Sequence, residues 1–310
     1  FINESLPQGG NPALITKEDV IAVSGSGLVE HSGGYYPAGT GIGYSINNGE
    51  SWSYKVQPVD SIPINGHFQT FSWGGQELNQ LAVTTEINNI TYDLAIVRDY
   101  IYSTSWAGGL RRFQFQNFNP AIPDEDPNPW EIIPLPMDNQ STLQCGLIDA
   151  ENFELNPNNP SNGGSNNHKA FSVYTSDDTT IWVGTAAGIN KGIIDTVTEC
   201  INWEHYKAIT HGFSGNWVIG FTHQEFENYN RIWAITWSTY DGFETNAISF
   251  SDNNGITWSI ATQIEELNIK VYNLSSHGDV VYASTEDGLY ITFDGEYWAK
   301  FPSIKDNDGQ

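Results

Sequence analysis

Two octapeptides far apart in the chain, SINNGESW at 45–52 and SDNNGITW at 251–258, repeat the same polar residues, glycine and tryptophan in register. A short polar side chain accepts hydrogen bonds from turn amides, glycine adopts a positive φ, and tryptophan buries a large ring beneath the turn. We therefore predict that each octapeptide closes a β-hairpin. The predicted turn residues, including a shortened copy at 292–298, are Ser45, Asn47, Gly49, Trp52, Ser251, Asn253, Gly255, Trp258, Asp294, Gly295 and Trp298.

Five further segments share a second pattern, in which an apolar and usually aromatic pair leads through small residues to a glycine, serine or threonine. Alternating apolar runs separated by Gly, Asn and Asp are typical of strands and turns. The last three segments recur at about 50-residue spacing, the size of one four-stranded propeller blade. They are IAVSGSGL (21–28), IYSTSWAGGL (101–110), IWVGTAAGI (181–189), IWAITW (232–237) and VYASTEDGL (281–289).

These patterns predict an all-β fold, a β-propeller of four-stranded antiparallel blades with about six blades and a range of five to seven. One propeller domain is expected over 1–304, with long Pro/Asn/Gly-rich loops near 117–129 and 151–168. Residues 305–310 are expected to begin a linker to a further domain. The intervals 28–101 and 110–181 exceed one blade, so the first allows either a degenerate blade or an insertion.

The segments GIGYSINNGESW (41–52), WAGGLRRF (106–113) and WVGTAAGINKG (182–192) give the chain a family resemblance. It resembles secreted bacterial β-propellers with BNR (Asp-box) or two-component-regulator-propeller repeats, of the kind that Bacteroidetes-type bacteria export. The resemblance implies a secreted, extracellular or cell-surface protein. It implies no single activity, because sialidases, xyloglucan hydrolases, sorting receptors and assembly factors share such blades.

Charge narrows the range of partners. The formal net charge is −25, from 37 acidic and 12 basic residues, which disfavours nucleic acid and anionic membrane surfaces. No apolar run is long enough for membrane insertion. Carboxylates are hard oxygen ligands, so calcium is permitted, and the acidic segments considered for it are 123–130 and 306–309. No cofactor is expected, and the best local metal-like group, HQEFE at 223–227, is interpreted as a solvated loop.

Two cysteines, Cys145 and Cys200, are present. An extracellular chain can join such a pair in one disulfide. Sequence alone leaves both alternatives open, since it does not give the distance between the two Cα atoms.

The search for catalytic residues selects no site. The arginines (Arg98, Arg111, Arg112 and Arg231) do not stand in the Phe/Tyr-Arg-Ile-Pro motif of sialidases, and Arg111 and Arg112 should point to opposite sides of a strand. A glycoside hydrolase needs two facing carboxylates, and no spacing selects a pair. The acidic candidates are Asp177, Asp178, Glu225, Glu227, Asp241, Glu244 and Asp287, and the candidate sugar-stacking rings are Trp73, Trp106 and Trp237.

The sequence therefore favours a non-catalytic extracellular or cell-surface module that binds a protein or glycan, or that serves a structural role among other copies or domains of a larger surface protein. The alternative hypothesis is a polysaccharide-degrading enzyme, a glycoside hydrolase or lyase, that uses acidic residues in a propeller cleft.

Overall fold

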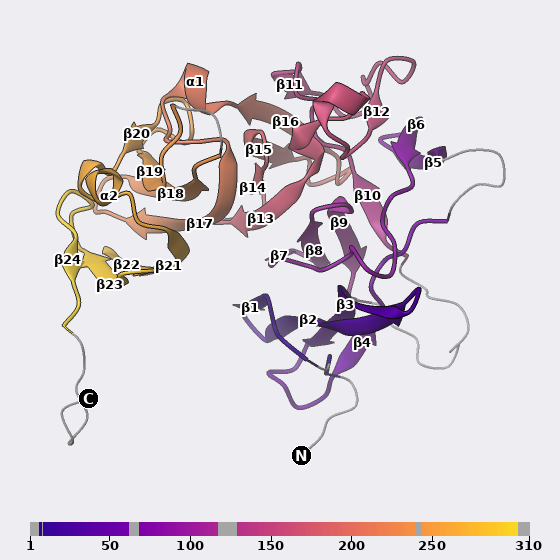
Figure 1. Ribbon diagram of the computed structural model, residues 1–310, viewed down its shortest axis with the longest axis horizontal. Helices are drawn as coiled ribbons and strands as arrows, with labels where there is room; N and C mark the ends of the chain where they lie inside the picture. Colours follow the sequence, from indigo (N-terminus) through magenta and orange to yellow (C-terminus); the bar gives the residue numbers. More distant parts are fainter. Residues whose placement is uncertain (1–5, 8, 62–67, 117–128, 240–242, 303–310) are drawn as a thin grey trace. The chain divides into compact units, whose positions relative to one another are not determined.

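The computed structural model describes residues 6–7, 9–61, 68–116, 129–239 and 243–302 (Figure 1). It is an all-β protein built mainly from four-stranded antiparallel sheets. The chain divides into two compact units, 1–206 and 207–310, and each unit is described by itself.

The first unit contains three sheets in which consecutive strands pair as an antiparallel meander. In each sheet the predicted apolar segment forms the second strand. This strand has neighbours on both sides, and its successive side chains point to opposite faces of the sheet. The first sheet is β1 (Leu14–Lys17), β2 (Val20–His31), β3 (Gly34–Ser45) and β4 (Ser53–Lys55); the second is β7 (Asp93–Val97), β8 (Tyr100–Ser105), β9 (Gly109–Gln114) and β10 (Glu131–Ile133); the third is β13 (Ala170–Thr175), β14 (Thr180–Thr185), β15 (Gly188–Ile194) and β16 (Ile201–Tyr206), with β11 (Thr142–Leu143) added outside β16.

A smaller sheet interrupts this series. The hairpin of β5 (Phe68–Trp73) and β6 (Gln76–Leu81) pairs through β6 with β12 (Glu154–Leu155), which runs parallel to it. Within 28–101, where the sequence allowed either a degenerate blade or an insertion, the described residues place β5 and β6 in a three-stranded sheet with β12.

The segment 151–168 differs from the surface loop predicted for it. Besides β12 it contains two 3-10 turns, Pro160–Asn162 and Asn166–His168. Phe153, Leu155 and His168 are each no more than 2% exposed. The segment is rich in Asn and Pro yet partly buried, because its polar groups bond within the fold. The other predicted loop, near 117–129, lies outside the described residues except for residue 129. The predicted linker at 305–310 also lies outside them.

The second unit contains two four-stranded meanders and two short helices. Its strands follow the predicted segments, with Ile232–Trp237 and Val281–Thr285 inside second strands. The elements are α1 (Ala208–His211), β17 (Trp217–Glu225), β18 (Asn230–Trp237), β19 (Ala247–Ser251), β20 (Ser259–Ile260), α2 (Thr262–Leu267), β21 (Val271–His277), β22 (Val280–Thr285), β23 (Gly288–Thr292) and β24 (Ala299–Lys300).

First strands of successive sheets lie side by side within each unit. In the first unit, the Asp93 carboxylate on β7 accepts a hydrogen bond from the Val173 amide on β13 at 3.0 Å. In the second unit, the hydroxyls of Thr222 on β17 and Ser276 on β21 are 2.8 Å apart. Apolar cores fill the space between such neighbouring sheets, with Trp203 and Ile181 in one core and Trp233 in another.

The octapeptide turns join third strands to fourth strands, β3 to β4 and β19 to β20. In the first, the Gly49 amide donates to Ser45 Oγ at 2.8 Å, the Ser51 amide donates to Asn47 Oδ1 at 2.9 Å, and Trp52 Nε1 donates to the Gly49 carbonyl at 3.1 Å. The same three bonds recur at 251–258 with lengths of 2.9, 2.9 and 3.1 Å.

The shortened copy at 292–298 keeps part of this pattern. The amides of Glu296 and Tyr297 both donate to Asp294 Oδ1 at 2.9 Å. Trp298 is 1% exposed, but its Nε1 has no hydrogen-bond partner among the described residues. This turn is one residue shorter than the octapeptide turns. It keeps the hydrogen bonds donated by backbone amides and lacks the one donated by the tryptophan indole.

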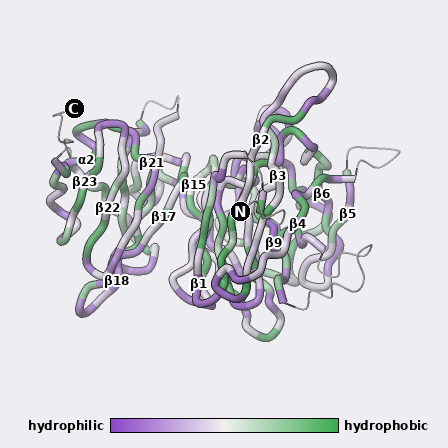
Figure 2. The backbone as a smooth tube through the Cα atoms, turned by 90° about the horizontal axis from the view of Figure 1, so that it is seen from below, coloured by the Kyte–Doolittle hydropathy of each residue, from purple (hydrophilic) through white to green (hydrophobic). Residues whose placement is uncertain are grey.

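The β2–β3 hairpin is longer than its sheet. β1 pairs with Val20–Val23 and β4 pairs only with residues 42–44, so 27–38 forms a two-stranded ribbon beyond them (Figure 2). No helix of the described chain is long and apolar enough to cross a membrane.

Candidate functional site

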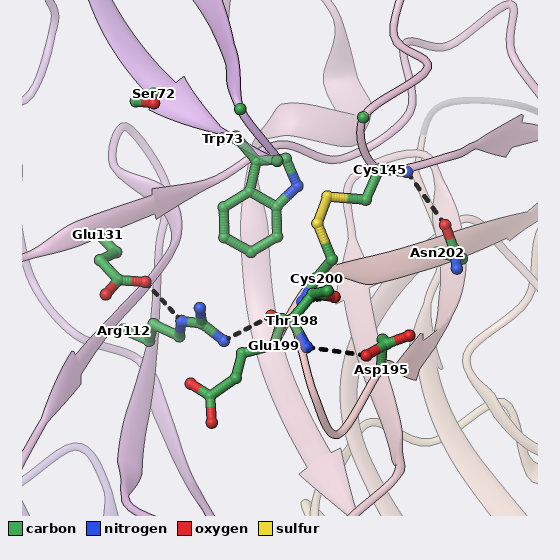
Figure 3. Close-up of a pocket in the computed structure, with 13 residues that line it drawn as sticks. Ser72, Trp73, Arg112, Glu131, Cys145, Asp195, Thr198, Glu199, Cys200 and Asn202 are labelled. Carbon is green, nitrogen blue, oxygen red and sulfur yellow. Dashed lines mark hydrogen bonds and ion pairs between the residues drawn. A yellow bond between two sulfur atoms is a disulfide. The ribbon is translucent and has the colours of Figure 1, made fainter.

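A pocket of about 570 Å³ opens in the first unit, where the β5–β6 hairpin meets β9, β10 and β16 (Figure 3). Trp73, Arg112 and a disulfide lie around one space in this view. The residues that line it are Ser72, Trp73, Gly74, Gly75, Arg112, Glu131, Cys145, Gly146, Asp195, Thr198, Glu199, Cys200 and Asn202.

The tip of the β5–β6 hairpin forms one wall because two glycines make its turn. Gly74 and Gly75 have φ of 58° and 75°, a region that side chains with Cβ resist. A Cβ on Gly74 would lie 2.5 Å from Cys145 Sγ. Glycine is therefore required at 74 both by the turn and by its close approach to the disulfide.

The disulfide joins Cys145, on the segment after β11, to Cys200, just before β16, with Cα atoms 5.8 Å apart. The Cys145 amide also donates to Asn202 Oδ1 at 3.0 Å. The two cysteines are 55 positions apart in the sequence, so their bond holds two distant walls of the pocket together. Of the alternatives left open by the sequence, the structure has the bonded form.

Arg112 is the most heavily contacted side chain of the pocket. Its Nε donates to Glu131 Oε2 at 2.8 Å, and one terminal nitrogen donates to the Tyr102 hydroxyl at 3.0 Å and the Glu199 carbonyl at 3.1 Å. Its guanidinium also lies 4.2 Å from the Tyr100 ring centre and 5.2 Å from that of Trp73. A planar cation between rings and acceptors is held rigidly.

Arg111 points to the other side of β9, as predicted. It forms a buried ion pair with Asp60 at 2.6 Å, with side-chain exposures of 6% and 1%. The Asp60 carboxylate also accepts a hydrogen bond from the Thr84 amide at 2.9 Å. This pair joins Asp60 and Thr84 to β9, so the two adjacent arginines have separate roles.

Three carboxylates face the pocket, and each already has a partner. Glu131 pairs with Arg112, and Glu199 Oε1 lies 3.3 Å from an Arg98 nitrogen. Asp195 accepts the amides of Val197 and Thr198 at 2.9 and 2.8 Å, and these amides lower its pKa. With Arg112, the lining side chains carry a formal charge of −2, from three carboxylates and one guanidinium.

The tyrosine beside the pocket is kept neutral. Burial, together with a hydrogen bond to the Glu199 carboxylate, raises the pKa of Tyr100. A neutral phenol beside a carboxylate donates a hydrogen bond to it. The pocket therefore has an acceptor-rich wall whose charges are fixed by neighbouring donors.

The predicted turn residues and acidic candidates lie elsewhere. Neither octapeptide contributes to the pocket. Asp177 accepts the Thr179 and Thr180 amides at 2.7 and 2.6 Å, as expected for a turn aspartate. Asp178 pairs with Lys17, and Asp287 pairs with Lys300.

The remaining acidic candidates are also dispersed. The Glu244 carboxylate accepts the Asn216 amide at 3.0 Å. Residues 223–225 form the end of β17 and not the solvated loop predicted for 223–227, and Glu225 lies 3.4 Å from His223 Nε2. Within the described ranges, no three His, Cys, Asp or Glu side chains are grouped to hold a metal ion. Asp241, Asp124, Glu125, Asp126 and 306–309 lie outside the described residues.

The three tryptophans proposed for sugar stacking separate in the structure. Trp73 lines the pocket with 6% exposure, Trp106 is 36% exposed, and Trp237 is partly buried with its Nε1 bonded to the Val271 carbonyl at 2.8 Å. Sequence reasoning did not identify Arg112 or Glu131 as site residues. The available signals were WGG at 73–75 and RR at 111–112, but nothing in the sequence relates them to Cys145 and Cys200.

No family model matches the sequence, and no curated protein matches it. Solved structures similar to this chain include the Dos1 propeller, with 11% identity, TM-score 0.49 and coverage of 96% of this chain and 59% of that one. Another is the extracellular domain of a putative hybrid two-component system from B. thetaiotaomicron, with 13% identity, TM-score 0.41 and coverage of 97% and 35%.

A third is the native Bacillus subtilis arabinanase, with 10% identity, TM-score 0.38 and coverage of 92% and 94%. The chain thus spans about three fifths of the Dos1 structure and about a third of the extracellular domain. At these identities and TM-scores, none of the similarities assigns an activity or a partner to this chain.

Proposed function

We propose that this protein is a non-catalytic, extracellular or cell-surface β-propeller that binds a partner through the pocket between the β5–β6 hairpin and the disulfide. The sheet meanders, with first strands side by side within each unit, support the propeller interpretation. The disulfide supports an oxidising location.

One observation carries the binding function: each carboxylate of the pocket already has a positively charged or amide donor. Acid–base catalysis needs a group that is free to exchange a proton with substrate. A rigid, acceptor-rich wall instead suits recognition of a donor. The lining side chains sum to −2, or to −1 when the Arg98 partner of Glu199 is counted. This negative charge favours a cationic donor, and we assign the pocket to a lysine or arginine side chain of a protein partner.

The test measures binding of the tripeptide Gly-Lys-Gly by calorimetry at physiological salt, against Gly-norleucine-Gly. We expect binding of the lysine peptide alone. Glu131→Gln and Glu199→Gln should each weaken it about tenfold, since a hydrogen bond to a charged group contributes roughly 1.5–3 kcal/mol.

Glu266→Gln is the matched control, because Glu266 is an exposed residue of α2 and its substitution changes net charge equally. It should leave binding unchanged. Equal weakening by all three variants would reveal a general charge effect and would overturn the pocket assignment.

The alternative, a polysaccharide-degrading enzyme, has one specific observation in its favour. Burial raises the pKa of Asp93 to about 7, against the opposing effect of two backbone amides, and a raised pKa is what a general acid needs. Its two oxygens, however, accept the Leu94 and Val173 amides at 2.9 and 3.0 Å. Release of reducing sugar from a polysaccharide panel, abolished by Asp93→Asn, would establish the enzyme in place of the binding module.

A further inference from the structure

An arrangement of tryptophan, a second aromatic ring and lysine occurs at the same position of the repeat in both units. Trp106 and Trp237 are both the sixth residue of aligned segments, IYSTSW (101–106) and IWAITW (232–237). Phe171 and Tyr272 are both the second residue of the next sheet's first strand. Each is preceded by a lysine two positions earlier in the chain. We name these groups the first platform (Tyr92, Trp106, Lys169, Phe171) and the second platform (Trp237, Lys270, Tyr272).

In the first platform, the ring centres of Trp106 and Phe171 are 5.4 Å apart, and those of Tyr92 and Phe171 are 6.3 Å apart. The Lys169 ammonium lies 5.3 Å from the Trp106 ring centre. Trp106 and Tyr92 are 36% and 41% exposed. The Lys169 Nζ is held by two hydrogen bonds, which it donates to the side-chain oxygens of Asn159 and Asn166 at 2.9 and 2.7 Å.

The second platform has similar spacings but a different angle between its rings, 85° for Trp237 and Tyr272 against 48° for Trp106 and Phe171. The ring centres of Trp237 and Tyr272 are 5.9 Å apart, and the Lys270 ammonium lies 5.2 Å from the Trp237 ring centre. Tyr272 is 52% exposed. The Lys270 amide donates to Glu286 Oε1 at 3.0 Å.

The sheets do not require these rings. Ala186 and Glu286 occupy the position of Trp106 and Trp237 in IWVGTA (181–186) and VYASTE (281–286), and both strands form the same ladder. The strands that carry Phe171 and Tyr272 even share a register irregularity, at 170/172 and 271/273. The strand ladder therefore does not account for these aromatic residues. Trp237 also packs against the apolar core of the second unit, whereas Trp106, Tyr92 and Tyr272 keep 36%, 41% and 52% exposure. Partly exposed rings at one repeated position point to a ligand.

We propose that both platforms bind a neutral polysaccharide of pyranose units. The apolar face of such a sugar packs on an aromatic ring, while its hydroxyls bond to polar side chains at the ring edge, here Asn159 and Asn166 at the first platform and Glu286 at the second. The net charge of −25 repels polyanionic chains, which favours a neutral one. The inference rests on the proposed binding function but uses no residue of the pocket.

The experiment is calorimetric titration of the full chain with three neutral hexasaccharides, cellohexaose, mannohexaose and xylohexaose, and with hexagalacturonate as the anionic comparison. We expect at least one neutral hexasaccharide to bind at two sites per chain, with quenching of tryptophan fluorescence. Trp106→Ala should remove one site, and Trp237→Ala or Tyr272→Ala should remove the other.

Trp106→Ala introduces the residue that the third sheet already has at Ala186, so it should fold. Tyr272→Ala replaces a largely exposed ring, and so tests the second platform even if Trp237→Ala is unstable. Tyr35→Ala, at a ring that is 70% exposed on the β2–β3 ribbon, is the matched control and should keep both sites.

Failure of all three neutral hexasaccharides to bind, binding at two sites in the Trp106→Ala, Tyr272→Ala double variant, or preference for hexagalacturonate would each overturn the proposal. Glu131→Gln should leave sugar binding intact, and the platform variants should leave Gly-Lys-Gly binding intact. Failure of the pocket assignment and failure of the platform assignment are therefore distinguishable.

Discussion

The two units of the chain are built from the same meander but stabilised differently. The described part of 207–302 has two four-stranded sheets and two short helices, with an apolar core around Trp233 and Trp298. In 1–206, the described segments between the regular sheets share an apolar core with them. They are also tied by bonds between distant residues, the Asp60–Arg111 ion pair and the Cys145–Cys200 disulfide among them. Repeated local patterns therefore build the sheets of both units, whereas segments outside the repeat are held by apolar, ionic and disulfide contacts between residues far apart in the sequence.

Removing the buried Asp60–Arg111 ion pair should have the largest effect on stability. Asp60→Asn should destabilise the protein by about 3–5 kcal/mol, because it leaves the Arg111 guanidinium buried without its counter-ion. Urea unfolding gives the size of the loss, and hydrogen exchange should locate it in 1–206. The double variant Asp60→Leu, Arg111→Met should recover part of the loss. A loss below about 1 kcal/mol for Asp60→Asn would show that the pair does not hold Asp60 and Thr84 to β9.

The disulfide is the next test. Replacing both Cys145 and Cys200 by serine should lower stability by about 2–4 kcal/mol, since the bond closes a long loop. The same variant should weaken Gly-Lys-Gly binding, because two walls of the pocket are no longer joined. Reduction of the unmodified protein is the control and should act alike. An unchanged urea midpoint in both would contradict this role.

Two buried titrating groups in the first unit should oppose each other across pH 4–7. Burial raises the pKa of Asp93 to about 7, so its stabilising contribution is full below its unfolded value near 3.8 and is lost as pH rises through 7. Burial lowers the pKa of His168 to about 4, so its contribution is full above 6.5 and is lost as pH falls through 4.

The two groups therefore give the free energy of unfolding opposite pH dependences, which largely cancel in the unmodified protein. Each variant removes one of them and leaves the other visible. Relative to the unmodified protein, Asp93→Asn should gain stability as pH rises from 4 to 7, and His168→Gln should lose it. Each difference should reach roughly 2–3 kcal/mol, since one pKa unit is about 1.4 kcal/mol and Asp93 keeps some solvent contact. Parallel pH profiles for the three proteins would refute this pairing.

The smallest effect compares equivalent turns of the two units. Ser251→Ala and Ser45→Ala each remove a buried hydroxyl that accepts a hydrogen bond from a glycine amide. Each should lower the free energy of unfolding by about 1 kcal/mol. The loss should be greater at 251, because Trp258 beneath that turn is 6% exposed whereas Trp52 is half-buried. Ser259→Ala, at an exposed position of β20, is the control. A greater loss at 45 would reverse the comparison.

The sequence determined the sheets of this protein. Short-range patterns were sufficient, because strand alternation, glycine turns and the Ser-Asn-Gly-Trp spacing act within a few residues. The predicted second strands are β2, β8, β14, β18 and β22 in the structure. The opposite directions of Arg111 and Arg112 also followed from strand geometry alone.

Tertiary structure alone decided the pocket and the burial of 151–168. Trp73, Arg112 and Cys200 are separated by dozens of residues, and no local pattern relates them. His168 is buried because its ring nitrogens meet the Asn156 amide and the Leu135 carbonyl, at 2.9 and 3.1 Å. Such partners depend on how segments pack against one another, which the local sequence does not show. For that reason the Asn- and Pro-rich segment 151–168 was predicted as a surface loop.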